Sequence, residues 1–427
     1  MTYPSPDGTE DRPAGHAAPD GAIDSALARI TAVDPAKFAE AYWGRQPLVT
    51  RADELAGADG FRDLLSPEAV DELLSERGLR TPFLRVADQG KVLPAASFTG
   101  SGGAGAEIGD QVTDDKVLRL YAGGATLVLQ GLHRLWPPLV RFAGRLGDEL
   151  CQPLQVNAYL TPAGNRGFAT HYDTHDVFVL QVDGTKRWRI HEPVLPDPLE
   201  RQAWGGRADE VGAVAEGPAA LDVVLAPGDA LYLPRGWLHS AEAQGERSLH
   251  LTFGVRALTR FAFVEELLAL AAEDSRLRAT LPYGMDVADP SAVAPELTDT
   301  VSALREWLLT ADPIRIADRL RARAWPAQRP APVRPLAQLA FAERLAPADQ
   351  VKIRAGLRWR LHDDGSDQVV LTLADRTLRL PAYCAPALHF VLDGDIHHVA
   401  DLPGLDDDAD RLVLVRRLLR EAVLVPA

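Results

Sequence analysis

The sequence predicts an α+β protein built around a β-sandwich or β-barrel, with helical segments on both sides of it. Between Leu154 and Val255, short apolar segments follow one another and are separated by turn signals. Closely spaced strands of this kind are typical of sandwiches and barrels. Beyond Arg256 the apolar residues recur at helical spacing instead. We therefore expect a β-rich centre with helical flanks.

Five strands are expected in the centre: Val156–Leu160, Asp176–Val182, Lys186–His191, Ala230–Leu233 and Ser248–Phe253. An Asp183-Gly184 pair separates the second strand from the third. Pairs of this type favour the tight turn of a β-hairpin, so we expect these two strands to pair with each other.

The segments before the centre are mostly helical. Asp34 and Pro35 are placed as the N-cap and first residue of a helix that stops at Gly44. The other expected elements are a helix at Ala22–Val33, strands at Leu48–Arg51 and Thr126–Gln130, a Gly/Ala/Ser-rich loop at Ala95–Ala106 and a helix at Pro137–Leu150.

After the centre we expect helices at Phe261–Ala272 and Val301–Leu309, followed by a linker rich in Pro, Ala and Arg at Pro326–Pro335. The rest of the chain is predicted to form a small separate α+β unit. Its expected elements are helices at Pro347–Ile353 and Asp408–Glu421 and strands at Gln368–Leu373 and Thr377–Leu380.

Composition excludes several classes of protein. Of the 427 residues, 46% are hydrophobic and 25% charged, which is not the composition of a collagen-like or disordered chain. No apolar run reaches the length of about 18 residues that a membrane span needs. The polar segment Met1–Asp20 does not have the pattern of a signal peptide, and the only two cysteines, Cys151 and Cys384, exclude a disulfide scaffold. A cytoplasmic location is expected.

Charge indicates the kind of partner. The formal net charge of −15 disfavours nucleic acid and anionic membranes and favours basic partners. The C-terminal unit also holds slightly more acidic than basic residues. We therefore interpret it as a structural or protein-binding module, with direct binding of nucleic acid not expected.

Two segments carry candidate metal ligands. His171 and Asp173 stand two residues apart, so in a strand they would share one face. His239 follows a Pro227-Gly-Asp turn signal, an apolar strand and Pro234. A lone His-x-Asp is usually a surface feature. If a barrel brings both segments together, however, two imidazoles and one carboxylate converge in the arrangement that leaves open coordination positions on Fe(II).

Motifs along the chain resemble those of the JmjC ribosomal oxygenases, which are 2-oxoglutarate- and Fe(II)-dependent protein hydroxylases of the cupin superfamily. The matching segments are Asp34-Pro…Phe38…Tyr42-Trp43-Gly44, Asn157-Ala-Tyr159-Leu-Thr-Pro162, His171-Tyr-Asp173, Asp176-Val-Phe-Val-Leu-Gln181, Lys186-Arg-Trp188-Arg and Pro227-Gly-Asp…Pro234…Trp237-Leu-His239. The helical segment after the barrel resembles the family's dimerisation domain, and the last hundred residues resemble its winged-helix domain.

The resemblance implies a double-stranded β-helix (cupin/JmjC) barrel with flanking helices, a helical dimerisation domain and a C-terminal winged-helix-like domain. The boundaries that follow are a disordered tail at 1–21, a catalytic domain at 22–255, a dimerisation domain at 256–325 and a winged-helix-like domain at 326–427.

Residue roles also follow from the resemblance. His171, Asp173 and His239 match the iron ligands, and Lys186 matches the residue that binds the distal carboxylate of 2-oxoglutarate. The remaining matches are Asn157, His250 and Thr252 in the co-substrate pocket and Tyr159 as a substrate-binding residue.

Simpler interpretations stay open at this point. Lys186 could be a solvated lysine beside a turn, Asn157 and Tyr159 ordinary strand residues, and His250 a packed core histidine. His175 is rejected as a ligand because the family pattern varies there, and His397-His398 is expected at the surface. Gly254 departs from the serine that family members often carry.

The sequence therefore predicts a homodimeric 2-oxoglutarate/Fe(II) oxygenase that hydroxylates a His or Arg side chain of a basic ribosomal protein. One alternative is the same chemistry on a small molecule or natural-product peptide, for which Gly254 leaves room. Another is a non-catalytic binding or regulatory protein. Histone demethylation is within reach of a JmjC barrel, but no feature of the sequence points to it.

Overall fold

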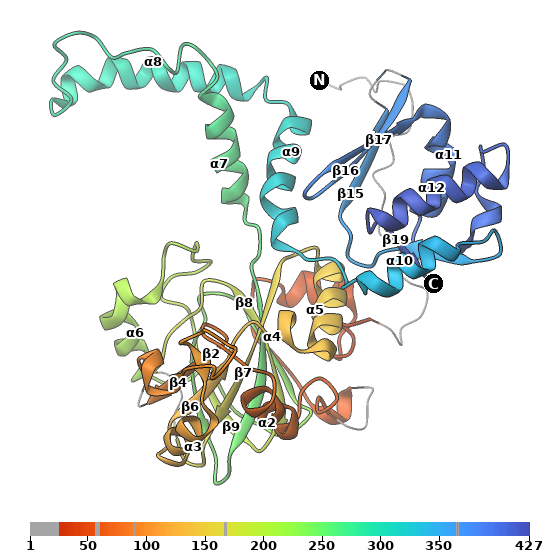
Figure 1. The fold of residues 1–427 in the computed structure, drawn as a ribbon. Coiled ribbons are helices and arrows are strands. Elements are labelled where there is room, and N and C mark those ends of the chain that lie inside the picture. The colour runs from red at the N-terminus through yellow and green to blue at the C-terminus, as the bar shows by residue number, and fades with distance from the viewer. Residues whose placement is uncertain (1–24, 56–59, 89, 166–168, 364, 366) are drawn as a thin grey trace.

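The computed structural model describes residues 25–55, 60–88, 90–165, 169–363, 365 and 367–427. The expected disordered tail at 1–21 lies outside these residues. Figure 1 shows a β-rich body, an arm built from α7, α8 and α9, and a C-terminal unit beyond the arm. Within the described part of the chain, no helix has the length and apolar character needed to cross a membrane.

Two antiparallel sheets form the body. The larger has the strand order β1-β11-β8-β13-β7-β6-β2-β3, and the smaller has the order β10-β9-β12. Their bounds are β1 Leu48–Thr50, β2 Leu84–Asp88, β3 Lys91–Val92, β6 Thr126–Leu129, β7 Leu154–Thr161, β8 Asp176–Asp183, β9 Lys186–His191, β10 Leu221–Leu225, β11 Ala230–Leu233, β12 Leu238–Ala243 and β13 Ser248–Val255. The sheets face each other, since the Trp188 ring on β9 meets the His250 ring on β13 at 5.4 Å.

Side chains alternate between the two faces of the larger sheet. The outward residues of β7 and β13 are apolar and pack with α5 (Pro137–Leu150), where Phe142 meets Phe253 edge-on at 5.4 Å. The inward residues of the same strands include Asn157, Tyr159 and His250. On these two strands the outer face packs into the large apolar core and the inner face is polar. Nearer β8 and β11, a second apolar cluster that includes Val179, Leu231 and Ile190 fills the space between the sheets.

The expected hairpin at Asp183-Gly184 is wrong. β8 pairs with β11 and β13, whereas β9 pairs with β10 and β12, so the turn carries the chain from one sheet to the other. Gly184 has a φ of +60°, and a Cβ there would lie 1.8 Å from the carbonyl oxygen of Arg247. The dipeptide correctly marked a tight turn, but the partner of each strand is decided by packing between distant segments.

The N-terminal part confirms one helix and corrects another. Asp34 caps α1 (Pro35–Lys37), which continues into a π-helical turn at Phe38–Tyr42. The described residues of the helix expected at Ala22–Val33 instead form turns. The backbone N–H groups of Ala26 and Leu27 donate to the Glu149 carboxylate at 2.6 and 2.9 Å, which replaces helical bonding there.

The smaller elements of the body lie around the sheets. They are α2 Pro67–Ser75, β4 Thr99–Gly100, β5 Gln111–Val112, α3 Asp114–Ala122, α4 Leu132–Leu135 and α6 Ala208–Ala215, with single helical turns at Ala52–Glu54, Ala95–Ser97 and Trp204–Arg207. The loop expected at Ala95–Ala106 therefore contains a helical turn and β4. The helix expected at Pro137–Leu150 is confirmed as α5.

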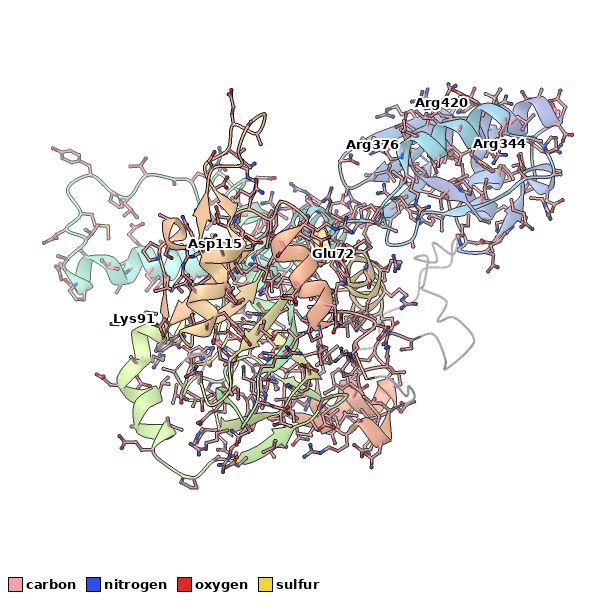
Figure 2. The ribbon with its side chains drawn as sticks, turned by 60° about the horizontal axis from the view of Figure 1, so that its bottom comes forward. Glu72, Lys91, Asp115, Arg344, Arg376 and Arg420 are labelled. Carbon is pink, nitrogen blue, oxygen red and sulfur yellow. The ribbon has the colours of Figure 1, made fainter. Side chains whose placement is uncertain are left out.

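The arm consists of α7 Arg260–Ala271, α8 Pro290–Leu308 and α9 Pro313–Ala324. The C-terminal unit has its own hydrophobic core. Its elements are α10 Pro335–Arg344, β14 Gln350–Ile353, β15 Trp359–Asp363, β16 Gln368–Leu373, β17 Thr377–Pro381, α11 Ala385–Val391, β18 His397–His398, α12 Asp408–Arg420 and β19 Leu424–Pro426. In Figure 2 its residues Arg344, Arg376 and Arg420 lie apart from Glu72 and Asp115 on the helices of the body.

One helix expected in the C-terminal unit, Pro347–Ile353, is wrong. Gln350–Ile353 form β14, which pairs with β18 and β19. Strand partners from distant segments override the local helical preference here. The helix expected at Asp408–Glu421 is confirmed as α12, whereas the winged-helix assignment of the unit stays a prediction.

Candidate metal and co-substrate site

Two histidines and one aspartate meet at one end of the space between the sheets. One ligand atom from each of His171, Asp173 and His239 lies within 4.8 Å of the others. His239 Nε2 lies 3.8 Å from Asp173 Oδ2, and the two imidazole centroids are 4.4 Å apart. The structure therefore brings together the three residues that the sequence proposed as a set.

The way in which they are brought together differs from the expectation. His239 belongs to β12, and His171 forms an isolated β-bridge with it, through N–H···O bonds of 2.8 and 3.2 Å. Asp173 lies outside any strand, so His171 and Asp173 do not share a strand face. The Gly236 N–H donates to the Asp173 carbonyl at 3.0 Å and holds this residue beside His239.

The Pro227-Gly-Asp turn fixes the strand that leads to His239. Asp229 is buried and accepts hydrogen bonds from the backbone N–H groups of Ala52 and Ala226 and from Arg51 Nη1. Gly228 has a φ of +93°, and a Cβ there would lie 2.8 Å from the Ala52 side chain. The Pro227-Gly-Asp turn thus ties the start of β11 to the segment after β1, and it fixes where β11 begins.

Both histidines are held in the form that ligates metal. His171 Nδ1 lies 2.8 Å from the Ala169 carbonyl oxygen, and His239 Nδ1 lies 3.1 Å from that of Trp237. A carbonyl oxygen can only accept, so each Nδ1 carries the proton and the lone pair is on Nε2. Imidazoles oriented by a second hydrogen bond of this kind are typical metal ligands.

The pKa shifts of His239 and Asp173 agree with metal binding. Burial, with repulsion from His171, lowers the pKa of His239 to about 4, which keeps this ring neutral. Burial alone raises the pKa of Asp173, but the neighbouring histidines outweigh it and the net shift is downward. Two imidazoles and one carboxylate are the donor set that suits Fe(II) with open positions.

Lys186 is buried at the start of β9, with 2% of its surface exposed. Its Nζ donates to Thr161 Oγ1 at 3.1 Å, and burial lowers its pKa to about 7. Among the described residues, no carboxylate pairs with it. The solvated-lysine interpretation is therefore wrong, and a buried ammonium group without an anion in the protein indicates an anionic ligand.

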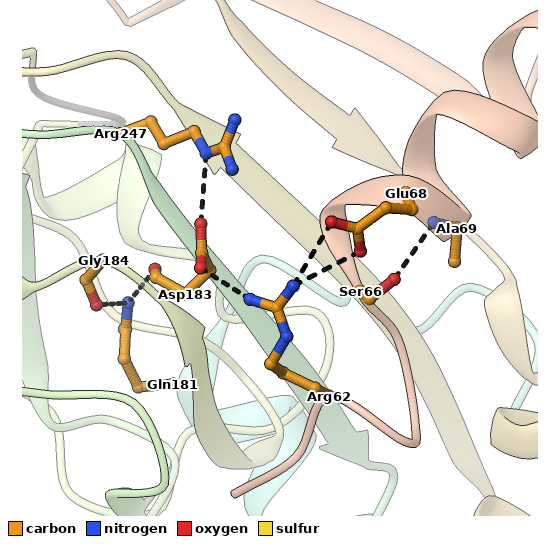
Figure 3. Close-up of polar contacts among 8 residues, drawn as sticks. All are labelled: Arg62, Ser66, Glu68, Ala69, Gln181, Asp183, Gly184 and Arg247. Atoms are coloured by element: carbon orange, nitrogen blue, oxygen red, sulfur yellow. Dashed lines mark hydrogen bonds and ion pairs between the residues drawn. The ribbon is translucent and has the colours of Figure 1, made fainter. Parts of the chain in front are cut away.

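A polar network fixes the turn that precedes Lys186 (Figure 3). The Asp183 carboxylate accepts from Arg62 Nη1 at 2.9 Å and from Arg247 Nε at 3.1 Å. Gln181 Nε2 donates to the carbonyls of Asp183 and Gly184. Side chains from three segments therefore set the entry of β9 and the position of its first residue.

The expected pocket residues line the same inner face. His250 pairs with Tyr159 and Thr252 with Asn157 across β13 and β7. The rings of Tyr159 and His250 are stacked, with their centroids 4.9 Å apart and an interplanar angle of 1°. Burial raises the pKa of Tyr159 to about 12, and burial, with the nearby Lys186 charge, holds the pKa of His250 well below its usual range. Both groups are neutral at physiological pH.

Several buried polar atoms in this space have no hydrogen-bond partner among the described residues. They include His250 Nδ1, Trp188 Nε1 and Gln181 Oε1. Buried polar atoms in folded proteins are nearly always paired. Unpaired atoms gathered between the sheets, beside Lys186, indicate a polar ligand and argue against a simple core role for His250.

Sequence reasoning missed Arg85 of β2. Cross-strand pairing places Arg85 opposite Val128 and Val128 opposite Tyr159, so Arg85 shares the inner face. Its Nε is buried and has no partner among the described residues. The only signal in the sequence was a charged residue inside an apolar segment, and that signal needs the strand order before it points to the site.

The structure also explains Gly254. The His175 ring lies over it, and a Cβ at Gly254 would lie 2.6 Å from both His175 Cδ2 and Nε2. Gln155 Nε2 lies 3.3 Å from the same His175 nitrogen. His175 is outside the three-residue cluster, and it fills the space that a serine at position 254 would need. His398 is exposed and His397 contacts Asp393, away from this site.

Comparisons with known proteins match this geometry. Residues 140–262 match a family model of the JmjC domain. Ribosomal oxygenase 1 of Rattus norvegicus is 30% identical over 256 residues, which is 57% of this chain and 38% of that protein. The bifunctional lysine-specific demethylase and histidyl-hydroxylase NO66 of Drosophila persimilis is 38% identical over 149 residues, covering 31% of this chain and 21% of that protein. The chain thus aligns with less than half the length of these relatives.

Among solved structures, the Escherichia coli ribosomal oxygenase YcfD superimposes with a TM-score of 0.53 at 19% identity. The superposition covers 93% of this chain and 99% of that one. At this identity the likeness shows a common fold.

Proposed function

Because this chain carries a JmjC domain, we propose that it is a 2-oxoglutarate- and Fe(II)-dependent oxygenase that hydroxylates a protein side chain. The convergence of His171, Asp173 and His239 on one point, with the buried Lys186 in the same space, is the observation that carries the proposal. A non-catalytic binding protein would need neither feature. Structures of YcfD in complex with cobalt and 2-oxoglutarate, and with cobalt and succinic acid, support it by analogy.

Each residue then has a defined task. Bound Fe(II) would supply the chemistry that couples oxidation of 2-oxoglutarate to hydroxylation of the substrate. His171, Asp173 and His239 hold the metal, and the Nδ1–H bonds keep the two imidazoles in the ligating tautomer. Lys186 neutralises the distal carboxylate of 2-oxoglutarate, with His250, Asn157 and Thr252 beside the co-substrate.

For the substrate we propose a His or Arg side chain of a ribosomal protein, bound at Tyr159. Ribosomal proteins are basic, and a chain of net charge −15 attracts basic partners. The names of the relatives point the same way. A small molecule or natural-product peptide is the second candidate, because Gly254 and His175 give this wall of the site a shape different from that of a serine-bearing member.

The test is to incubate the iron-loaded protein and 2-oxoglutarate with purified ribosomal proteins and, separately, with candidate metabolites and methylated histone peptides. Succinate formation coupled to a gain of one oxygen on a ribosomal histidine or arginine is expected. The Asp173→Ala variant is the matched control. Coupled turnover with metabolites or peptides alone, or formaldehyde release from methylated lysine, would contradict the assignment.

We also propose that residues 256–325 mediate a homodimer in the cytoplasm. Large apolar side chains remain exposed on the arm: Phe263, Val264 and Leu268 on α7 and Leu297 and Val301 on α8. Exposed apolar surface of this kind often marks a protein contact. Light scattering is expected to give about twice the chain mass of 46.2 kDa, and the Phe263→Glu/Leu268→Glu double variant is expected to give the chain mass itself. For residues 326–427 we propose a winged-helix-like domain that binds protein or supports the fold.

A further inference from the structure

A second cavity, of about 600 Å³, lies on the opposite side of the sheet from the metal site. One wall is formed by α4, α5 and the start of β7. The other is formed by the segment from Ala327 to Pro332 and by Arg354 to Gly356. The two walls are tied together by Arg358, whose Nη2 lies 3.2 Å from the Asp148 carboxylate.

The charge of this cavity is opposite to that of the whole protein. Five arginines line it, and the single carboxylate in the lining, Asp148, already pairs with Arg358. The arginines are Arg134, Arg141, Arg145, Arg329 and Arg354. The lining is therefore positively charged in a chain whose net charge is −15.

Most of these guanidinium groups are not used by the fold. Within the described residues, the side chains of Arg134, Arg141 and Arg329 form no hydrogen bond or ion pair. All three are exposed residues that lie at the rim of the cavity. Arg354 donates to the Ala331 carbonyl. Burial, together with repulsion from Arg376 and Arg329, lowers the pKa of Arg354. A bound anion would offset the repulsion among these positively charged groups.

The cavity also has an apolar floor. Val140, Ala143 and Leu154 form it on one side, with Pro330 and Pro332 opposite. An apolar floor with a charged rim fits a ligand that has both an organic body and several negative charges. The volume is in the range of small-molecule sites, which rules against a folded protein partner inside it.

We propose that this cavity binds an organic polyphosphate of nucleotide size, with its phosphates on the arginine rim and its organic body on the apolar floor. Arginine is the residue best suited to such a ligand, because its planar fork of donors matches phosphate oxygens. The site is separate from the metal centre and does not depend on the proposed oxygenase activity.

The experiment measures binding to the full-length protein by calorimetry at physiological ionic strength, with ATP, inorganic tripolyphosphate and a short single-stranded RNA as probes. Arg141→Gln and Arg329→Gln remove one donor from each wall, and each is expected to weaken ATP binding about tenfold. Arg278→Gln, which removes an exposed arginine from the arm, is the matched control and is expected to change nothing.

A third variant tests the cavity without changing any charge. Gly144 lies in α5 on the lining, and a Cβ there would meet no atom within 4 Å. Gly144→Leu places a side chain in the cavity and favours the helix, so the protein is expected to fold and ATP binding to be lost. Thermal unfolding of each variant checks the fold.

The three probes distinguish the sources of phosphate. ATP is expected to bind more tightly than tripolyphosphate, because only ATP has an organic body for the apolar floor. Equal binding of the two would overturn the organic ligand. RNA binding tighter than ATP binding, and lost in the same variants, would assign the phosphates to a nucleic-acid strand and overturn the nucleotide-sized ligand. The proposal is also overturned if no probe binds below about 1 mM, or if Arg141→Gln, Arg329→Gln and Gly144→Leu all bind ATP as well as the unmodified protein.

Discussion

In β7 and β13 of the eight-stranded sheet, the two faces carry opposite chemistry on the same strand. Outward residues of β7 and β13, such as Ala158, Leu251 and Phe253, are fully buried among apolar side chains. Of the inward residues one position away, His250 is buried and Tyr159 half-buried, and several of the polar groups around them have no partner among the described residues. The outer face therefore contributes stability, whereas the inner face retains unpaired groups that a ligand can satisfy.

The strongest test of this division is removal of a metal ligand on the inner side. Ala in place of His171, Asp173 or His239 is expected to abolish turnover, because the two remaining ligands hold Fe(II) poorly. Thermal stability of the metal-free protein should change little. Iron content and succinate formation are the measurements. Because His175 lies outside the cluster, the His175→Ala variant should keep its iron. Full iron content and full activity in the His239 variant would contradict the assignment of the metal ligands.

A substitution on the outer face should lower the stability of the protein and leave ligand binding nearly unchanged. Phe253 is fully buried and packs edge-on against Phe142. Phe253→Ala is expected to lower the free energy of unfolding by about 3–5 kcal/mol, as for other large-to-small core changes. Denaturant unfolding measures this. Below the unfolding transition, affinity for 2-oxoglutarate should stay within about twofold of the original. A large loss of that affinity in folded protein would mean that the two faces are not independent.

Lys186 offers a smaller and more specific test. Lys186→Met keeps the aliphatic stem and removes a buried charge. Loss of a charged hydrogen bond costs about 1.5–3 kcal/mol, so the affinity for 2-oxoglutarate should fall roughly 10- to 150-fold. Without ligand the variant should be at least as stable as the original, because a buried ammonium group disfavours folding. Calorimetric titration and thermal unfolding separate the two effects, and unchanged affinity would place the anchor elsewhere.

The pKa of Lys186 predicts a dependence on pH. With that pKa lowered to about 7, the folded protein loses this proton at lower pH than the unfolded chain does. The unfolded chain therefore binds more protons above pH 7, and the stability of the ligand-free protein should gain from rising pH between about 7 and 10.

Ligand binding should show the opposite trend. The 2-oxoglutarate dianion favours the protonated lysine, so its affinity should fall above pH 7, by at most about tenfold for each pH unit. Calorimetry in buffers of different ionisation heat should detect proton uptake on binding at pH 8. Lys186→Arg stays charged, so it should bind with little pH dependence and in part retain affinity. Equal affinity of the original protein at pH 7 and pH 9 would argue that Lys186 is already protonated in the empty site.

Much of the fold could be predicted because its signals are local. β9, β11 and β16 have the bounds that alternation and turn residues indicated, and α5 follows its Pro-initiated apolar pattern from first residue to last. Errors arose where distant segments compete with the local pattern. Gln350–Ile353 became a strand because β18 and β19 lie beside it, and the turns near Ala26 formed because Glu149 accepts their N–H groups.

The candidate site likewise contains residues that the sequence could identify and features that only the three-dimensional structure explains. The identities of the metal-ligand set, Lys186 and the pocket residues could be proposed from motifs, because the chemistry restricts which residue types can serve. Arg85 could not, because its place depends on the order of strands β2, β6 and β7. Gly254 could be recognised as unusual, but its reason, the His175 ring above it, exists only in three dimensions.

By itself, the sequence determined many of the strands and helices, such as β9, β11 and α5, and which side chains can bind a metal and an anion. These properties depend on neighbours a few residues away and on the chemistry of single groups. Only the tertiary structure decided that β8 and β9 lie in different sheets, that Lys186 is buried without a carboxylate partner among the described residues, and that arginines from two separate walls face one cavity. The physical reason is that burial and electrostatic environment arise from contacts between segments far apart in the chain, which no local pattern specifies.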